Sequence, residues 1–393
     1  MILDEAARFL SRYSTPFFLF DLNRIKENYH RMAGAFPGAF IRYAMKANNH
    51  PVILTLLKEL GSGFEVASQA EVATLTAINV PCENMIFSAP IKLDQHIRNA
   101  HCRGVDLFVF DCHDELVKLA KAAPGSRVLV RVTVPNSGSL FPLNTKFGSS
   151  PEQAVYLLQK AQGLGLHPYG ITFHVGSQCE RKQTWGEAME VTAGIWRQAV
   201  NRGINLSALD IGGGFPVPYD HEVTPIEEIA QEVLSSFHAE FPLGVELIIE
   251  PGRYLVGNAA VLVTSVIAKA DRGEEDWIYL DASALHGLFE ALQLDGQFPY
   301  AVKADKDDGS RSKYVLSGPT CDPDDTILRE VWLPALGVGD KLCIMNTGAY
   351  SFVYATRFHG LPAPGIYFTA ARGIEVRGCD DAGIREKSGI YQR

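Results

Sequence analysis

The residue with the clearest chemical potential is a lysine that directly follows a short apolar run, Lys46 in Ile41-Arg-Tyr-Ala-Met-Lys46. A lysine at the end of a strand is ordinarily a solvated cap, because its long stem lets the ammonium group reach water. A partly buried lysine can instead have a lowered pKa and form a Schiff base with an aldehyde. The surroundings of Lys46 alone do not distinguish these interpretations, so the other polar residues must be considered.

A second group of residues suits the binding of an anion. Three consecutive glycines begin at Gly212, directly after an apolar run that ends at Ile211, and Gly252 and Arg253 follow another such run. A glycine run lets backbone N–H groups approach a phosphate closely, although an ordinary flexible turn has the same composition. The arginine beside the second glycine favours the phosphate interpretation, and Ser177 would add a hydroxyl group.

His174 and Glu250 also stand at the ends of apolar runs. The histidine is either a satisfied core residue, a proton carrier, or a flat ring that stacks on a planar cofactor. The glutamate is either an ion-pair partner of Arg253 or a carboxylate that keeps a pyridine nitrogen protonated. A lysine for an aldehyde, a phosphate site and a carboxylate for a pyridinium are together what pyridoxal 5′-phosphate requires.

A regular alternation of strands and helices positions these residues. After a helix predicted at 23–36, the apolar runs predict strands at 41–44, 64–66, 85–87, 106–110, 127–132, 169–174, 206–211 and 245–250. Helices are predicted between and after them at 50–60, 69–78, 94–102, 113–122, 151–164, 183–202 and 224–239. The alternation implies parallel strands, and no Gly-x-Gly-x-x-Gly turn follows the first strand. We therefore predict an α/β fold with a closed (β/α)8 TIM-like barrel rather than a doubly wound sheet.

Such a barrel carries its active site at the C-terminal ends of its strands. The polar and glycine-rich residues gather there: Lys46 after the first strand, Glu65 on the second, Arg131 on the fifth, His174 on the sixth, Gly212 to Gly214 after the seventh and Glu250 to Arg253 after the eighth. One face of the barrel is therefore the predicted site.

The chain beyond Gly257 has a different pattern, with strand-like segments separated by Gly, Pro and Asp clusters. These segments lie at 261–268, 277–280, 314–316, 341–345 and 366–368. We predict a barrel domain at 23–257 and a C-terminal mostly β domain built from 258–393 together with 1–22, which an early strand at 15–20 would join. The tail from Gly378 is expected to be weakly ordered.

The composition excludes several classes of protein. The chain has 393 residues, of which 47% are hydrophobic and 21% charged, as in a soluble protein with a sizeable core. A net charge of -9 disfavours nucleic acid as a partner. The seven cysteines are dispersed without a Cys-x-x-Cys motif, which suits a reducing compartment and predicts no metal site. With no signal peptide and no apolar run long enough for a bilayer, we expect a cytoplasmic protein without a membrane partner.

Seven motifs in order resemble those of the fold-type III, alanine racemase-like PLP-dependent decarboxylases, and within that group ornithine decarboxylase and its relatives. The resemblance extends from about Thr15 to Phe368. The motifs are Tyr43-Ala-Met-Lys-Ala-Asn48, Gly63-Phe-Glu-Val-Ala-Ser68, His174-Val-Gly-Ser177, Leu209-Asp-Ile-Gly-Gly-Gly-Phe-Pro216, Glu250-Pro-Gly-Arg-Tyr254, Gly318-Pro-Thr-Cys-Asp322 and Gly348-Ala-Tyr350.

The resemblance implies a role for each of these residues. Lys46 would form the Schiff base with the cofactor, His174 would stack on its ring, and Glu250 would bind the pyridine nitrogen. The residues implied in phosphate binding are Ser177, Gly213, Gly214, Gly252, Arg253 and Tyr350. Arg131 and Glu65 correspond to residues that contact the ring or lie behind it.

The resemblance also implies a homodimer with shared active sites, to which the β domain would contribute. Cys321 matches a cysteine donated across the dimer interface, where it helps to direct the proton returned to the carbanion carbon. Asp322 matches a carboxylate that faces the far end of the substrate. The expected reaction is loss of the α-carboxylate as CO2, followed by protonation of the same carbon to give an amine.

Three residues bear on the substrate. Asp295 corresponds to an acid that binds a distal ammonium group, so Asp295 and Asp322 would bracket the end of a basic amino acid. Phe358 resembles an aromatic wall of the substrate pocket. The expected activity is decarboxylation of L-ornithine or L-lysine to a diamine, as in polyamine biosynthesis. The alternative role of Asp295 is to begin the turn with Gly296.

Other activities on the same scaffold stay open. Met45, Asn48-Asn49 and the Phe-Glu-Val sequence at Phe64 resemble decarboxylases of siderophore and antibiotic pathways, which act on larger amino-acid conjugates. Diaminopimelate decarboxylase is disfavoured, since no arginine-rich segment is placed to bind a second carboxylate. An amino-acid racemase would need a second base opposite Lys46. A non-catalytic homologue is disfavoured by the intact Lys46, Arg253 and Cys321.

Overall fold

The computed structural model describes residues 2–370 and 373–375. The chain divides into two compact units, each described here by itself. One unit comprises Asn28–Val217 and Val223–Leu255, and the other comprises Met1–Glu27, Pro218–Glu222 and Val256–Arg393. The domain boundaries predicted from the sequence, a barrel domain at 23–257 and a β domain at 1–22 and 258–393, stay predictions. Within the described ranges, no helix is both long enough and apolar enough to cross a membrane.

Eight parallel strands close into a barrel in the first unit, in the order β10-β11-β2-β3-β4-β5-β6-β8 and back to β10. They are β2 (Phe40–Ala44), β3 (Gly63–Val66), β4 (Met85–Phe87), β5 (Leu107–Phe110), β6 (Arg127–Arg131), β8 (His167–Thr172), β10 (Ala208–Asp210) and β11 (Glu246–Ile249). All eight correspond to predicted strands, so the predicted (β/α)8 barrel is confirmed.

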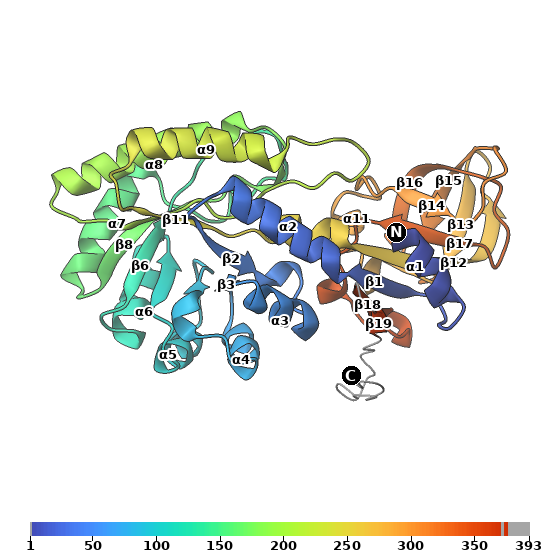
Figure 1. Ribbon diagram of the computed structural model, residues 1–393, viewed down its shortest axis with the longest axis horizontal. Helices are drawn as coiled ribbons and strands as arrows, with labels where there is room; N and C mark the ends of the chain where they lie inside the picture. Colours follow the sequence, from blue (N-terminus) through green and yellow to red (C-terminus); the bar gives the residue numbers. More distant parts are fainter. Residues whose placement is uncertain (1, 371–372, 376–393) are drawn as a thin grey trace. The chain divides into compact units, whose positions relative to one another are not determined.

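The helices lie around the outside of the barrel (Figure 1). They are α2 (Leu22–Ala35), α3 (Pro51–Glu59), α4 (Gln69–Ala77), α5 (Asp94–Cys102), α6 (His113–Ala122), α7 (Pro151–Gly163), α8 (Gln183–Asn201) and α9 (Ile226–Glu240). Their first turns carry the expected signals: Ser68 accepts a hydrogen bond from the Glu71 N–H, and Ser150 forms a capping box with Gln153. Local sequence therefore determines where these helices begin.

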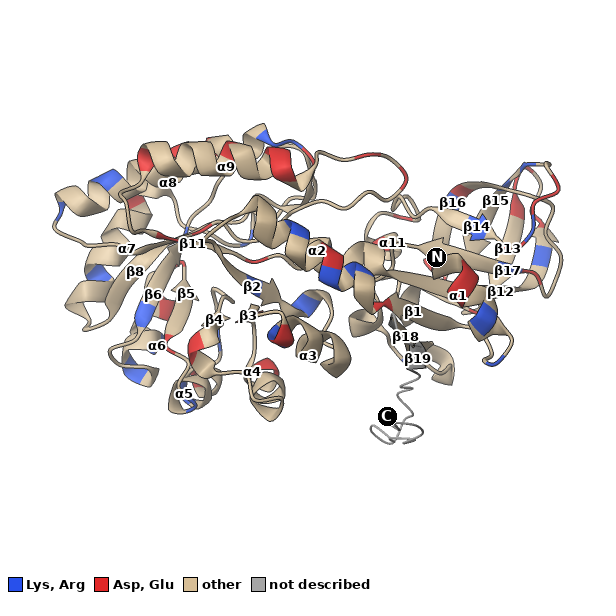
Figure 2. Ribbon diagram, in the orientation of Figure 1, with Lys and Arg blue, Asp and Glu red and all other residues tan. Residues whose placement is uncertain are grey.

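Charged residues of both signs are distributed over the helices and loops, as Figure 2 shows. Some pair across neighbouring helices, since Lys182, just before α8, and Arg197 on α8 bind Glu228 and Glu240 on α9. Inside the barrel, six apolar side chains from five strands form a buried core: Ile86, Leu107, Val109, Leu129, Ala208 and Ile248. Charges of both signs thus cover the outside, and an apolar layer fills part of the barrel interior.

Short elements complete this unit. A two-stranded antiparallel sheet joins β7 (Ser139–Phe141) to β9 (Ser177–Cys179), so that Phe141 pairs with Ser177. A 3-10 turn, η1 (Met45–Ala47), follows β2 and carries the lysine, η2 (Cys82–Asn84) precedes β4, and α10 (Arg253–Val256) follows β11. The sequence did not predict β7 and β9, whose three-residue strands are too short for a periodicity signal.

The second unit is built on a nine-stranded mixed sheet within the described residues. Its strands are β1 (Phe17–Asp21), β12 (Ala260–Asp271), β13 (Asp276–Leu280), β14 (Val302–Ala304), β15 (Ser312–Ser317), β16 (Thr326–Leu333), β17 (Lys341–Met345), β18 (Gly365–Ala370) and β19 (Gly373–Glu375). Short helices accompany them: α1 (Ile2–Leu10), α11 (Phe289–Gln293), η3 (Gly257–Ala259), η4 (Ala284–His286), η5 (Phe352–Tyr354) and η6 (Phe358–Gly360).

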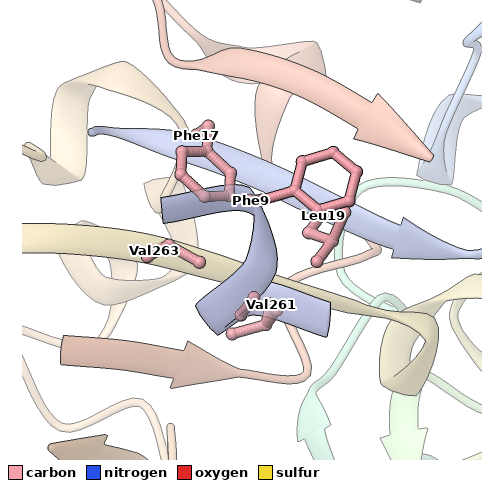
Figure 3. Packing of buried hydrophobic residues seen from close by; sticks show 6 residues of the cluster. Phe9, Phe17, Leu19, Val261 and Val263 are labelled. Carbon is pink, nitrogen blue, oxygen red and sulfur yellow. The ribbon is translucent and has the colours of Figure 1, made fainter. Parts of the chain in front are cut away.

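The predicted early strand joins this sheet. β1 runs antiparallel to β12 and parallel to β18, with Phe17 opposite both Val263 and Gly365. Phe9 from α1 packs on the same face, against Phe17, Leu19 and Val263 (Figure 3). The first residues are therefore held in place by apolar burial. The predicted weakly ordered tail from Gly378 lies outside the described residues.

Candidate active site

Lys46 lies at the mouth of the barrel, one turn beyond β2. Its Nζ is 2.8 Å from Glu65 Oε2, on the adjacent strand β3. The lysine side chain is 44% exposed, whereas the glutamate side chain is 2% exposed. Lys46 is therefore an amine that reaches the surface of the site while a buried carboxylate fixes its position.

His174 follows β8 and is held in one orientation. Its Nδ1 accepts a hydrogen bond from the Gly176 N–H at 3.0 Å, so a neutral ring carries its proton on Nε2. Removal from water, followed by the charges of Arg131 and Lys46, lowers the pKa of His174 well below its usual value. The imidazole is thus a neutral, flat surface at physiological pH.

The three glycines after β10 are required by the close approach of neighbouring backbone. A Cβ on Gly212 would lie 2.4 Å from the Phe173 carbonyl oxygen, and one on Gly214 would lie 2.3 Å from the Gly176 carbonyl oxygen. Gly212 and Gly214 also have positive φ angles of 65° and 106°. Gly213 would place a Cβ 2.6 Å from the Glu250 carbonyl oxygen. No side chain fits here, so the turn presents bare backbone.

Arg253 and Ser177 lie beside each other in the same unit. Arg253 is buried, and its Nη2 and Nε donate to Ser177 Oγ at 3.1 and 3.4 Å. The guanidinium also lies 6.0 Å from the ring centroid of Phe141. Gly252, directly before the arginine, is buried as well. A buried cation with a hydroxyl group is a donor set that suits a phosphate.

Glu250 and Arg131 complete the charged groups of the mouth. Glu250 is buried, and its Oε1 accepts a hydrogen bond from Ser88 Oγ at 2.5 Å. Burial, followed by the charges of Asp210 and Glu65, raises the pKa of Glu250 well above its usual value. Burial lowers the pKa of Arg131, and the charge of Glu250 opposes this shift. Burial therefore favours the protonated form of Glu250.

Asp210, at the end of β10, was not singled out from the sequence. It is fully buried and accepts hydrogen bonds from Thr172 Oγ1 at 3.0 Å and from the Gly212 N–H at 2.9 Å. A further hydrogen bond joins its side chain to Glu250. The available signal was an acidic residue within the apolar run Leu209-Asp-Ile211, where a buried strand seldom has a charge.

The first unit thus brings together most of the predicted site residues at the C-terminal ends of its strands. They are Lys46, Glu65, Arg131, His174, Ser177, Gly213, Gly214, Glu250, Gly252 and Arg253. The Ala44 N–H donates to the Pro251 carbonyl oxygen at 3.1 Å. This bond holds the loop after β11, which carries Gly252, against the end of β2.

The remaining predicted residues lie in the second unit, in its loops and in the 3-10 turn η6. They are Asp295, Cys321, Asp322, Tyr350 and Phe358. Cys321 is an exposed free thiol, and Tyr350 has a positive φ of 53°. Asp295 is 70% exposed, accepts a bond from Arg329 Nη2 at 2.6 Å, and has a positive φ of 49°. Asp295 therefore forms the predicted turn with Gly296 and also an ion pair with Arg329.

Asp325, a second residue that sequence reasoning missed, organises the loop of Cys321. It is 1% exposed, and its carboxylate accepts bonds from Ser283 Oγ, the Ala284 N–H and both Thr320 donors at 2.7 to 3.1 Å. A Cβ on Gly318 would lie 2.3 Å from this carboxylate. The loop that carries Cys321 is thus fixed from within its own unit.

The sequence pattern of one protein family, described as "Pyridoxal-dependent decarboxylase, pyridoxal binding domain", matches residues 22–257. This match covers more than half of the chain, and the chain belongs to this family of PLP-dependent decarboxylases. The fold-type III, ornithine decarboxylase-like resemblance of the motifs is thereby confirmed.

Individual relatives agree with the family. The chain is 38% identical to the lysine/ornithine decarboxylase of Selenomonas ruminantium, over 98% of each chain. A solved structure of the protein named SrLDC with PLP and cadaverine is 37% identical, with a TM-score of 0.86 and 93% of each chain covered. The cadaverine complex of lysine/ornithine decarboxylase from Vibrio vulnificus is 34% identical, with a TM-score of 0.84, over 94% of this chain and 98% of that one.

The residues of the barrel mouth fit the cofactor of this family. A turn without side chains at Gly213 and Gly214, with the buried Arg253 and Ser177, suits its phosphate. Lys46 has the primary amine that its aldehyde requires, and the buried carboxyl group of Glu250 is of the kind that suits its ring nitrogen. Pyridoxal 5′-phosphate is therefore the cofactor of this enzyme.

Proposed function

We propose that this enzyme removes the α-carboxylate of a basic L-amino acid, L-ornithine or L-lysine, as CO2 and releases the diamine. The observation that carries this proposal is the pairing of Lys46 with the buried Glu65 at the barrel mouth. Similarity to two lysine/ornithine decarboxylases, one of them solved with cadaverine, supports the choice of substrate.

The first task of the protein is to hold the cofactor. Arg253, Ser177 and the backbone at Gly213 and Gly214 bind its phosphate through charge-assisted and backbone hydrogen bonds. Tyr350, in the second unit, is proposed to add a hydroxyl group to the same phosphate. When bound, the cofactor supplies an electron sink for the negative charge left by loss of CO2.

The second task is to control protons and water around the reacting carbon. Lys46 is the amine that reacts with the aldehyde, and Glu65 keeps this amine in position. His174 offers a neutral flat face, because its pKa is far below the working range. Glu250 would supply the proton that the ring nitrogen needs. Arg131 contributes a positive charge that interacts with Glu250.

The residues proposed to bind the distal end of the substrate belong to the second unit. Asp322 and Asp295 are proposed to bind the distal ammonium, with Phe358 as an apolar wall that is 42% exposed. Asp295 keeps 70% of its side chain exposed while it binds Arg329, so surface is left for a second cation. A carboxylate pair at this end would exclude amino acids with neutral side chains.

The proposal includes a homodimer with shared active sites in the cytoplasm. Cys321 is proposed to act across the dimer interface and to direct the proton returned to the α-carbon. Its exposed free thiol, on a loop fixed by Asp325, supports this role. The free cysteines among the described residues suit a reducing compartment.

The experiment is a measurement of CO2 release from the PLP-loaded protein with L-ornithine, L-lysine, L-arginine, D-ornithine and meso-diaminopimelate, with the products identified by mass. We expect turnover of L-ornithine or L-lysine and none with Lys46→Ala. Silence with all five amino acids would contradict the proposed substrate class and favour a larger conjugate. Loss of the L-enantiomer without CO2 would indicate a racemase.

A further inference from the structure

Two buried carboxyl groups come from neighbouring strands of the barrel. Asp210 ends β10 and Glu250 follows the neighbouring parallel strand β11, in which Ile248 is the register partner of Asp210. The side chains of Asp210 and Glu250 are joined by a hydrogen bond. Such a bond between two carboxyl groups requires a proton, because two carboxylates offer only acceptors.

The surroundings of the two carboxyl groups differ. Asp210 accepts from Thr172 Oγ1 at 3.0 Å and from the Gly212 N–H at 2.9 Å, and it is attracted by the charge of Arg42. These groups favour the ionised form of Asp210. Among the described residues, Glu250 accepts one further hydrogen bond, from Ser88. The proton of the pair therefore belongs on Glu250.

We propose that Asp210 is a positioning residue that keeps a proton on Glu250 in the cofactor-free protein, and that Glu250 gives this proton to the pyridine nitrogen when the cofactor binds. The O–H bond of Glu250 breaks and an N–H bond to the ring nitrogen forms. The carboxyl pair goes from one negative charge to two, and the ring gains one positive charge. No proton is taken from solvent at this position.

The relative pKa values agree with this assignment. Burial, together with the charge of Asp210, raises the pKa of Glu250 well above its usual value. Burial raises the pKa of Asp210 to about 6, while its hydrogen bonds to Gly212 and Thr172 oppose the shift. These shifts favour a proton on the Glu250 side of the pair, and the two carboxyl groups titrate as a unit.

Charged groups of the other strands interact electrostatically with the same pair. They are Arg42 on β2, Lys46 after β2, Glu65 on β3 and Arg131 on β6, and the titratable His174 after β8 is influenced by Arg131 and Lys46. Among the described residues, the buried Nε and Nη1 of Arg42 have no hydrogen-bond acceptor. A guanidinium with unused donors and a net attraction to Asp210 offsets the second negative charge when the proton leaves.

The test counts protons rather than turnover. Titration calorimetry of the cofactor-free protein with pyridoxal 5′-phosphate, in two buffers of different ionisation enthalpy at about pH 7.5, gives the net number of protons taken up. In Asp210→Asn the negative neighbour of Glu250 is lost while its burial remains, so a smaller fraction of Glu250 holds a proton before binding. The ring nitrogen then takes more of its proton from solvent. We expect the variant to take up more protons per site than the wild type, up to about one.

Asp106→Asn is the matched control, because Asp106 binds Arg127 elsewhere on the barrel. It should leave the proton count unchanged. Equal counts in the wild type and Asp210→Asn would overturn the proposal. Infrared spectroscopy of the cofactor-free wild type covers the case in which Asp210→Asn fails to fold or to bind. A protonated buried carboxyl band at about pH 7.5 is expected, and its absence would overturn the proposal on its own. Neither measurement depends on which amino acid is the substrate.

Discussion

The amine of Lys46 lies 2.8 Å from a carboxylate oxygen of Glu65, and the two residues come from adjacent strands of the barrel. Because Ala44 on β2 is the register partner of Glu65 on β3, the distance is determined by the closed sheet itself. The glutamate is buried while the lysine is half exposed. A rigid carboxylate therefore positions a reactive amine that substrate can still reach.

Glu65→Gln should lower the turnover of the PLP-loaded enzyme while Lys46 remains able to react with the cofactor. The loss of a charged hydrogen bond is worth about 1.5–3 kcal/mol, which corresponds to about 10- to 150-fold in rate. Steady-state kinetics together with absorbance of the bound cofactor measure both effects. If Glu65→Gln matched the complete loss expected of Lys46→Ala, Glu65 would have a chemical role of its own.

Gly214→Ala should weaken cofactor binding and stability together. The new Cβ would meet the Gly176 carbonyl oxygen at 2.3 Å, in addition to the strain of a positive φ of 106°. Gly203→Ala is the matched control, since its φ of 75° is also positive but no atom lies within 4 Å. The control should cost about 1–2 kcal/mol in urea unfolding, and Gly214→Ala clearly more. Equal losses would show that backbone strain alone matters at Gly214.

The pattern of the barrel strands was predictable from the sequence because each strand is a short apolar run followed by an amphipathic helix. β16 was missed for the opposite reason: Arg329 and Glu330 interrupt its apolar pattern, and it lies at an edge of its sheet. The helix at the N-terminus was also missed, although Phe9 is fully buried. Its burial comes from tertiary contacts with β1 and with β12, which is more than 240 residues away in the sequence.

The candidate site was predictable where the local sequence itself indicates a function, as with Gly252 and Arg253 after a barrel strand, which together suit the binding of an anion. Asp210 was not recognised, because its role depends on the neighbouring strand and on Glu250, 40 positions away in the chain. Asp325 was not recognised either, since four donors converge on it only in the folded loop. Long-range partners of buried polar groups cannot be inferred from local spacing.

A buried ion pair outside the site should give a measurable pH dependence of stability. Lys92 Nζ lies 2.9 Å from Glu115, and both side chains are fully buried. Burial lowers the pKa of Lys92 to about 8, whereas the unfolded chain keeps the ordinary value of 10.5. Between these values the unfolded chain binds more protons, so the contribution of Lys92 to the free energy of unfolding increases with pH.

Lys92→Met removes this titration and leaves Glu115 without one partner. Urea unfolding of the wild type and the variant at about pH 7.5 and 9.5 should therefore show a stability difference that grows with pH. The variant itself should lose about 3–5 kcal/mol, and a second change, Glu115→Leu, should restore part of it. Parallel pH profiles for wild type and Lys92→Met would contradict the lowered pKa.

Asp325→Ala should loosen the loop that carries Cys321. Four donors lose their common acceptor in a buried position, which predicts a loss of about 2–4 kcal/mol in the free energy of unfolding. The exposed Asp324→Ala is the control and should be nearly neutral. We expect Asp325→Ala to react faster with a thiol reagent at Cys321. An unchanged rate of modification would mean that Asp325 stabilises the unit without positioning the cysteine.

Asp295 could bind the substrate or shape its own loop. Its ion pair with Arg329 allows the two roles to be distinguished by mutation. If Asp295 binds the distal ammonium of the substrate, Asp295→Asn should raise the KM for L-ornithine or L-lysine about tenfold or more, since a charged hydrogen bond is lost. Arg329→Gln removes the other side of the same 2.6 Å contact and leaves the carboxylate in place. It should lower KM or leave it unchanged, because a competing cation is gone. If both variants raise KM alike, the ion pair shapes the loop and Asp295 does not recognise the substrate.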